Sequence, residues 1–237
     1  MTSSKANAEP LRKRRSQKAE RRAAAQSLVQ LYTCLAQTGG HLLYPILSGQ
    51  SPVQWQHYPA DDAIDREHRY QWFYHSHSPA DRPSSIEHGH FHLFARMEGT
   101  STLIDADHER DFLKVMGTPD SSATTRHLLC IGMSSVGVPI SIFTVNRWVT
   151  GDLLLSGRGT TALLESIMMD TGHSEIDTLL IALIRLYRRD VRILMRKRDA
   201  VLATRSECGP GAFDDVNLEV LSTLTLNLDD RIAQAIA

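Results

Sequence analysis

The clearest pattern in the chain is an alternation of aromatic and polar residues on both sides of a proline-rich segment. Residues 70–77 and 87–94 change character at every second position, which is typical of β-strands. Residues 78–85 contain two prolines and several turn-forming residues, so we expect a connecting loop between the strands. The pattern predicts an antiparallel hairpin in which His75 lies opposite His90.

A second hairpin is predicted further along the chain. Residues 126–135 and 140–145 carry apolar and β-branched side chains at successive positions, and a short turn separates them. Strands that are apolar on both faces are typical of the middle of a sheet. Residues 48–66, in contrast, are rich in turn formers and are predicted to be irregular, and a short helix is expected around residues 109–115.

Both ends of the chain have helical periodicity. Apolar residues keep helical spacing between residues 11 and 37, and Gly39 and Gly40 are expected to end that helix. Three more helices are predicted at residues 160–169, 177–204 and 213–236. This order indicates an α+β fold, with an antiparallel sheet of His-rich and apolar hairpins and the N-terminal and C-terminal helices packed on one side.

The 237 residues have an apolar content that can bury a full core. We predict a disordered tail at residues 1–10 and one globular domain at residues 11–237. Within it we expect a long helix at 11–38, a sheet region at 66–150 and a helical region at 159–237. Three separated cysteines, no signal peptide and no long apolar run indicate a cytoplasmic protein without a membrane partner.

The start of the first predicted helix is strongly basic. The basic positions are Arg12, Lys13, Arg14, Arg15, Lys18, Arg21 and Arg22. They are dense enough to suggest phosphate contact, or they form the solvated start of an amphipathic helix. Because the apolar positions of this segment keep helical spacing, the sequence favours the solvated helix. The net charge of only -1 also argues against a nucleic acid partner. A homo-oligomer is left open.

The first hairpin concentrates histidines. A period of two places five of them on one face: His75, His77, His88, His90 and His92. Residues two apart on a strand lie about 6.6 Å apart, so one pair from each strand can reach a common ion. We expect His75, His77, His88 and His90 to bind a metal, with His92 as an alternative ligand. Glu87 is then a catalytic base or a hydrogen-bond partner of a ligand.

Neutral imidazole suits several transition metals, and no cysteine lies nearby in the sequence. Zinc and iron are the first candidates, with copper as a further choice. The leading hypothesis is a metal-dependent enzyme, hydrolytic or oxidative, that acts on a small molecule. A noncatalytic metal or haem sensor or carrier is the alternative, and a partner-binding protein that uses the basic helix is a third. A polar network without metal is the plainest interpretation of the cluster.

Other side chains are weaker candidates. Arg147 follows a predicted strand and either holds an anionic group at a catalytic site or forms a structural salt bridge. His57 and Asp65 supply a further ligand or belong to a merely hydrophilic loop. Cys130, with His127 nearby, is a weak nucleophile candidate, and an inert buried thiol is the favoured interpretation.

Two resemblances rest on these residues. The blocks Glu87-His-Gly-His-Phe-His92 and Phe143-Thr-Val-Asn-Arg-Trp-Val-Thr150 resemble an uncharacterised bacterial family, a domain of unknown function, over roughly residues 57–199. This likeness implies that both blocks belong to one domain.

The second resemblance is to the zinc motif of JAMM-type metallopeptidases. It is carried by His75-Ser-His77 and by Ser85, and it implies zinc binding by the two histidines and an oxyanion role for the serine. Ser78 stands where that family has proline, and His88 stands at the position of its aspartate. A JAMM-like zinc peptidase is therefore a second alternative function.

Overall fold

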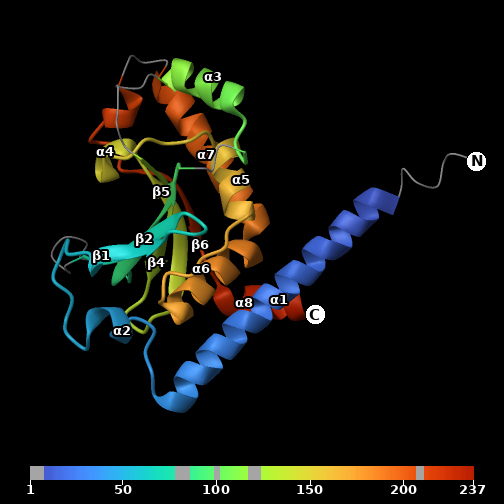
Figure 1. The fold of residues 1–237 in the computed structure, drawn as a ribbon, viewed down its shortest axis with the longest axis vertical. Helices are drawn as coiled ribbons and strands as arrows, with labels where there is room; N and C mark the ends of the chain where they lie inside the picture. The colour runs from blue at the N-terminus through green and yellow to red at the C-terminus, as the bar shows by residue number, and fades with distance from the viewer. Residues whose placement is uncertain (1–7, 78–85, 99–101, 117–123, 207–210) are drawn as a thin grey trace, which may run out of the picture.

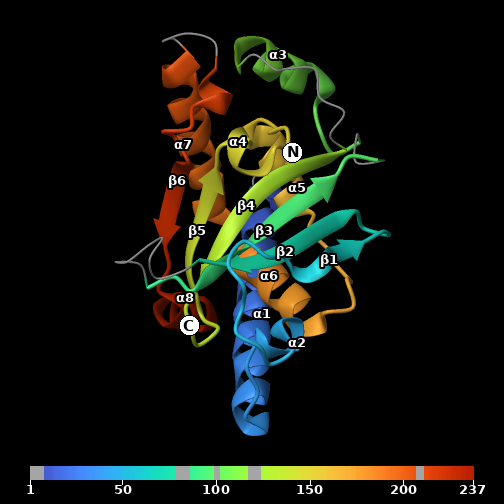
Figure 2. The same cartoon turned by 90° about the vertical axis from the view of Figure 1, so that its left-hand side faces the viewer.

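The computed structural model describes residues 8–77, 86–98, 102–116, 124–206 and 211–237. The start of the predicted tail and the predicted 78–85 loop lie outside these residues. The described part is an α+β fold in which one antiparallel sheet has its strands in the order β1-β2-β3-β4-β5-β6. The longest helices lie behind one face of this sheet (Figures 1 and 2).

The strands are β1 (Tyr58–Asp65), β2 (Tyr70–Ser76), β3 (Gly89–Arg96), β4 (Thr125–Met133), β5 (Pro139–Val145) and β6 (Val220–Thr225). The longer helices are α1 (Ala8–Thr38), α3 (Ala106–Met116), α5 (Gly157–Glu165), α6 (Ser174–Leu186), α7 (Arg188–Ser206) and α8 (Leu228–Ile236). Short turns of helix are α2 (Tyr44–Leu47), α4 (Arg147–Thr150) and η1 (Ala212–Asp214).

The predicted register of the first hairpin is confirmed, because His75 pairs with His90 across β2 and β3. The second hairpin is also confirmed, since β4 pairs with β5. The alternation of side chains sends Trp72, Phe91 and Leu129 into one buried cluster on the helix-covered face. The alternate positions of β2 and β3 then form the opposite face, which carries most of the histidines.

The helix after residue 173 packs its leucines on this sheet, as predicted. Leu179, Leu180 and Leu183 of α6 belong to the same buried cluster as Trp72. The indole Nε1 of Trp72 also donates a hydrogen bond of 2.8 Å to Oδ1 of the buried Asp177. This bond ties β2 to the first turn of α6.

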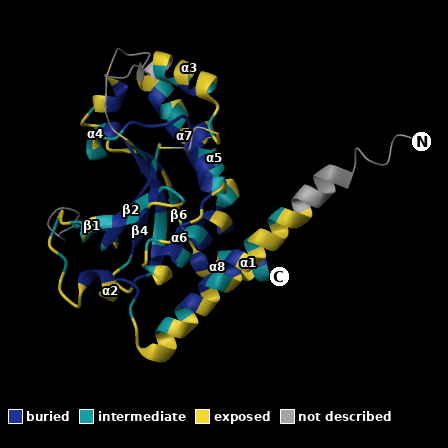
Figure 3. Cartoon of the chain, viewed as in Figure 1, coloured by how far each residue is buried: buried dark blue, intermediate teal, exposed yellow. Residues whose placement is uncertain are grey.

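The first helix packs along α6 and α8 and ends where the sequence predicts. Ala24, Ala25 and Leu28 are buried in the main core. Gly39 adopts a φ of 64°, and the amide of Gly40 donates to the carbonyl of Leu35 at 2.8 Å, which closes the C-terminus. The N-terminal part of α1 extends away from the sheet and is largely exposed from residue 15 to residue 23 (Figures 1 and 3).

Two helical predictions need correction. The expected helix at 177–204 is divided into α6 and α7 at Tyr187, whose hydroxyl donates to the carbonyl of Asn227 at 3.0 Å. The apolar stripe continues across this interruption, so periodicity does not reveal it. The expected helix at 213–236 contains β6, which pairs with β5, and only its last part is helical as α8. The region at 159–237 is therefore not wholly helical.

The sheet also begins earlier than predicted. The segment expected to be irregular, residues 48–66, contains β1 at the edge of the sheet. This strand includes Pro59 and three aspartates and has an irregular register next to β2. An edge strand pairs on one side only and tolerates proline and charge, so its sequence lacks the usual strand pattern.

Because of Glu165 at the end of α5, the free energy of unfolding should depend on pH. Burial raises the pKa of this carboxyl, but Arg192 and Arg188 outweigh burial and lower the pKa from 4.5 to about 2. A lowered folded-state pKa stabilises the fold above the unfolded value near 4.5, and this contribution is lost as the pH falls towards 2. With allowance for solvent screening, we expect Glu165→Gln to lower the free energy of unfolding by about 1 to 2 kcal/mol at neutral pH. Urea unfolding at pH 7 and pH 2.5 tests this; an equal difference at both pH values would contradict it.

Candidate metal centre

The histidine cluster lies on the sheet face opposite α1 and α6, which is turned towards the viewer in Figure 2. His75 comes from the end of β2, His77 follows that strand, and His90 and His92 come from β3. His75, His90 and His92 are each less than 8% exposed. Strand pairing and the period of two thus bring together four of the five predicted ligands.

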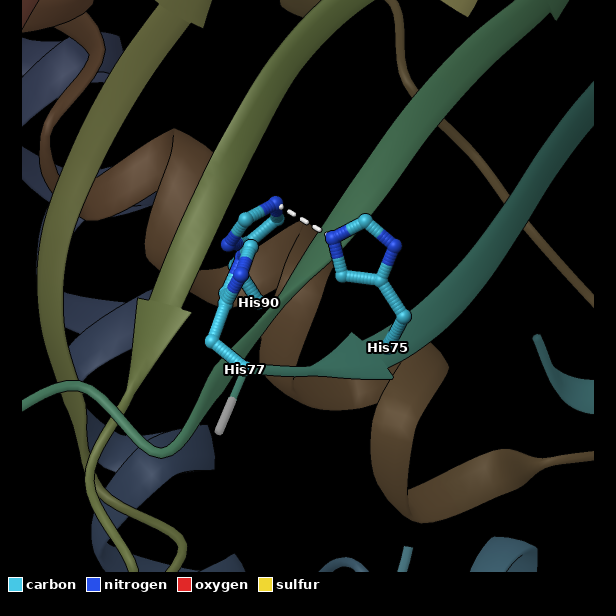
Figure 4. Close-up of side chains that lie close together, drawn as sticks. All are labelled: His75, His77 and His90. Carbon is cyan, nitrogen blue, oxygen red and sulfur yellow. Dashed lines mark hydrogen bonds between the residues drawn. The ribbon is translucent and has the colours of Figure 1, made fainter. Parts of the chain in front are cut away.

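The ring nitrogens of this cluster converge. His75 Nε2 lies 2.9 Å from His90 Nε2, and His90 Nε2 lies 3.0 Å from His92 Nε2. His75, His77 and His90 each offer a nitrogen within 4.8 Å of the other two (Figure 4). Nitrogens bound to one tetrahedral zinc lie about 3.3 Å apart, so modest ring movements would accommodate an ion.

A carboxylate orients the central histidine. His90 Nδ1 lies 2.8 Å from Glu87 Oε1. A carboxylate only accepts hydrogen bonds, so the N–H of His90 is at Nδ1 and donates to Glu87, while the lone pair of Nε2 faces the other histidines. Gly132 of the neighbouring β4 makes room for this carboxylate, since a Cβ there would lie 2.4 Å from Glu87 Oε2. This carboxylate–histidine arrangement is the one that metal-binding imidazoles commonly have.

We expect Glu87→Gln and Gly132→Ala each to weaken metal binding by about tenfold, because both disturb the partner that orients His90. The alanine Cβ would meet Ser141 Oγ at 2.3 Å as well as the Glu87 carboxylate, and because both are side-chain ends that can shift, the melting temperature should change little. Isothermal titration of metal-free protein with zinc measures the affinity. Since both changes act through one hydrogen bond, the double variant should bind nearly as well as the weaker single variant. Additive losses would show that Gly132 acts by another route.

A second group of side chains adjoins the first through His90. His90, His92 and Cys130 each offer a ligand atom within 4.8 Å of the others, and all three are buried. The Sγ of Cys130 lies 3.4 Å from His92 Nδ1, because Cys130 and His92 are directly paired between β4 and β3. The expectation that no cysteine accompanies the histidines is therefore wrong, since sheet pairing brings a thiol that is distant in sequence.

His127 of β4 extends this second group. Its Nε2 lies 3.1 Å from His92 Nδ1. Burial lowers the pKa of His92 well below 6.5, and neighbouring histidines lower it further. Burial, followed by the charge of Arg198, lowers the pKa of His127 to about 3. Both imidazoles are therefore neutral at neutral pH, which is the form that binds metals.

The family is decided by a match over most of the chain. A family model described as "Domain of unknown function (DUF6969)" matches residues 22–226. The chain belongs to the DUF6969 family. No curated protein and no solved structure matches the chain.

His88 of this DUF6969 protein lies apart from the other histidines. Its Nδ1 is 2.7 Å from the hydroxyl of Tyr74, a residue of the core on the helix-covered side. The prediction that all five histidines share one face of the sheet is therefore wrong for His88, because β3 begins only at Gly89. His88, which stands where the JAMM motif has its aspartate, is thus turned away from His75 and His77. Ser85 lies outside the described residues.

A cavity of about 330 Å³ adjoins the histidines of the DUF6969 protein. His75 and His92 line it, together with Trp55, Phe73 and Phe94. The exposed Trp55 ring makes edge contacts with His75 and His77, at centroid distances of 5.5 and 4.9 Å. Its other walls are largely polar and include Asp62, Gln71, Thr125, Thr150 and Asp152. A small cavity that combines aromatic walls with convergent polar groups is a candidate small-molecule site.

The two further ligand candidates have different places. His57 lines the same cavity, where it stacks on Phe73 at 3.6 Å and its Nδ1 lies 2.9 Å from Asp62 Oδ1. Asp65 instead accepts hydrogen bonds from the amides of Glu67, His68 and Asp170 in and beyond the β1–β2 turn. Asp65 therefore supports local structure.

Arg147 lies outside both histidine groups. Its guanidinium forms an ion pair with Asp214 and lies 5.2 Å from the centre of the Phe213 ring. It is not among the residues that line the cavity, although Val149 and Thr150 of the same short helix are. These contacts favour the structural salt bridge over a catalytic role.

Proposed function

We propose that this protein binds one divalent transition metal ion through His75, His77 and His90, and that the ion acts on a small molecule in the adjoining cavity. Zinc and iron are the first choices, with copper as a further choice. The observation that carries the proposal is the convergence of imidazole nitrogens around His90, whose Nδ1 is held by Glu87.

Three neutral imidazoles leave room for water or substrate on a metal ion, which is the usual composition of a catalytic zinc site. When bound, such an ion lowers the pKa of water or polarises a substrate. His75 lines the cavity directly, so a molecule there would lie beside the ligands. Glu87 is engaged by His90 and is therefore a positioning residue in this proposal rather than the base.

The buried group His90, His92 and Cys130 favours a second candidate, a noncatalytic metal sensor or carrier. Each of its three ligands is buried, and a thiolate binds soft ions tightly. His92 of this group lines the cavity, whereas His90 and Cys130 do not.

Elemental analysis of protein purified without an affinity tag tests the proposal. We expect about one equivalent of a transition metal, or uptake of one equivalent by metal-free protein in zinc-supplemented buffer at neutral pH. A cobalt-loaded sample then separates the two groups, because a thiolate ligand adds an intense near-ultraviolet band that imidazoles do not. Protein that takes up no metal would contradict both candidates, and a strong thiolate band would favour the carrier.

A further inference from the structure

The helical side of the molecule has a long basic groove. Two hollows of about 880 and 590 Å³ lie there, and they share Arg189, Arg192 and Ile193. The first also involves Lys18 and Arg21 of α1 and residues of α8, and the second extends to the start of α5. Together their lining contains nine lysines and arginines but only three acidic residues. Since the whole chain has a net charge of -1, the rest of the molecule is net negative.

Part of this positive charge is neutralised within the protein. Glu165 forms ion pairs with both Arg188 and Arg192, and Glu20 pairs with Arg188 at 2.9 Å. Arg231 pairs with Asp190 at 3.1 Å, and Arg158 pairs with Asp105 at 3.3 Å. Further basic side chains of the groove form no ion pair among the residues that the structure describes, and these include Lys18, Arg21, Arg189 and Arg196. Lys18, Arg189 and Arg196 are also exposed. Like charges gathered in this way repel each other, so a bound anion would stabilise the arrangement.

The composition of the groove indicates phosphate. Eight of its nine basic residues are arginines, whose planar guanidinium groups bind phosphate oxygens in pairs. None of the lining residues is Phe, Tyr or Trp. Proteins that hold single strands use aromatic side chains to stack on bases, so this groove suits a backbone whose bases are already paired.

The first helix continues the basic surface away from the body of the protein. Its N-terminal part extends past the other helices (Figure 1), and its described side chains include four basic ones between residues 15 and 22, namely Arg15, Lys18, Arg21 and Arg22. An extended basic helix beside a basic groove gives a long positive track, whereas a single phosphate or nucleotide would need only a compact pocket.

We propose that this groove binds the sugar–phosphate backbone of double-helical nucleic acid, without reading its sequence. The sequence alone favoured a solvated helix face, because it could not show that α1 places its charges beside the arginines of α7. The proposal does not depend on the metal centre, which occupies the other face of the sheet.

Fluorescence anisotropy with a fluorescein-labelled 20-base-pair DNA duplex of arbitrary sequence tests this proposal. We expect a micromolar dissociation constant near 0.1 M salt, with affinity falling about as the fourth power of salt concentration if about four phosphates are neutralised. Arg189→Glu/Arg196→Glu should weaken binding at least tenfold and reduce the salt exponent by about two. Arg66→Glu, an exposed change of the same charge between β1 and β2, should have less than a twofold effect.

A charge-neutral variant separates lost attraction from added repulsion. Arg189→Gln/Arg196→Gln removes the charge without adding a negative one, and circular dichroism and metal content should be unchanged in it while duplex affinity falls. Absence of duplex binding by the wild-type protein, or wild-type affinity in both double variants, would overturn the proposal. Tighter binding to a single strand, or displacement of the duplex by phosphatidylglycerol vesicles at equal phosphate concentration, would also overturn it.

Discussion

Replacing His90 by alanine is expected to weaken metal binding at least a hundredfold. His90 is shared by both possible ligand groups, and its Nε2 lies within 3.0 Å of the nitrogens of both His75 and His92. Loss of a partner that only orients a ligand costs about ten- to a hundredfold, so loss of the central ligand should cost more. Titration of metal-free protein with zinc, followed by calorimetry or tryptophan fluorescence, measures the change.

His88→Ala is the matched control for this experiment. It removes a histidine two residues away whose imidazole bonds to Tyr74 on the other side of the sheet. We expect its zinc affinity to stay within about threefold of wild type, although the loss of one hydrogen bond should lower stability by about 1 kcal/mol. Equal losses in both variants would show that His88 is a ligand and that its ring turns towards the other histidines when the metal binds.

The double variant His75→Ala/His77→Ala is expected to lose stoichiometric metal and to keep its fold. These two histidines complete the group that adjoins the cavity, and the main core lies on the other face of the sheet around Trp72 and Phe91. Elemental analysis after dialysis measures the metal, and the melting temperature reports the fold.

Cys130→Ser is the complementary variant, because it removes the thiol of the buried group and leaves His75 and His77 in place. We expect it to retain one equivalent of metal. If Cys130→Ser lost the metal while the double histidine variant retained it, the ion would lie in the buried group, and the noncatalytic alternative would replace the enzyme hypothesis.

The sequence by itself determined the elements whose pattern is local. The period of two in residues 70–77 and 87–94 specified the strands of the His-rich hairpin and their two faces. The pairing of His75 with His90 was a hypothesis built on that pattern, and the structure confirms it. Helical spacing and Gly39 similarly specified the existence and the C-terminal end of α1, although the helix begins at Ala8 and so includes residues 8–10, which were predicted to be disordered. In these segments the same residues that favour the local conformation also form the buried face, so local pattern and tertiary packing agree.

Tertiary structure decided what depends on neighbours that are distant in the chain. Cys130 and His127 join the cluster because β4 pairs with β3, and β6 becomes a strand because β5 offers an open edge for it to pair with. His88 turns to Tyr74 although the alternation predicted otherwise, because β3 begins at Gly89 and not at residue 87. The basic groove exists only because α1 lies along the helical layer and brings Lys18 beside Arg189. The pattern along a segment reflects only the periodicity of that segment, whereas a site is formed by side chains from several segments that tertiary packing brings together.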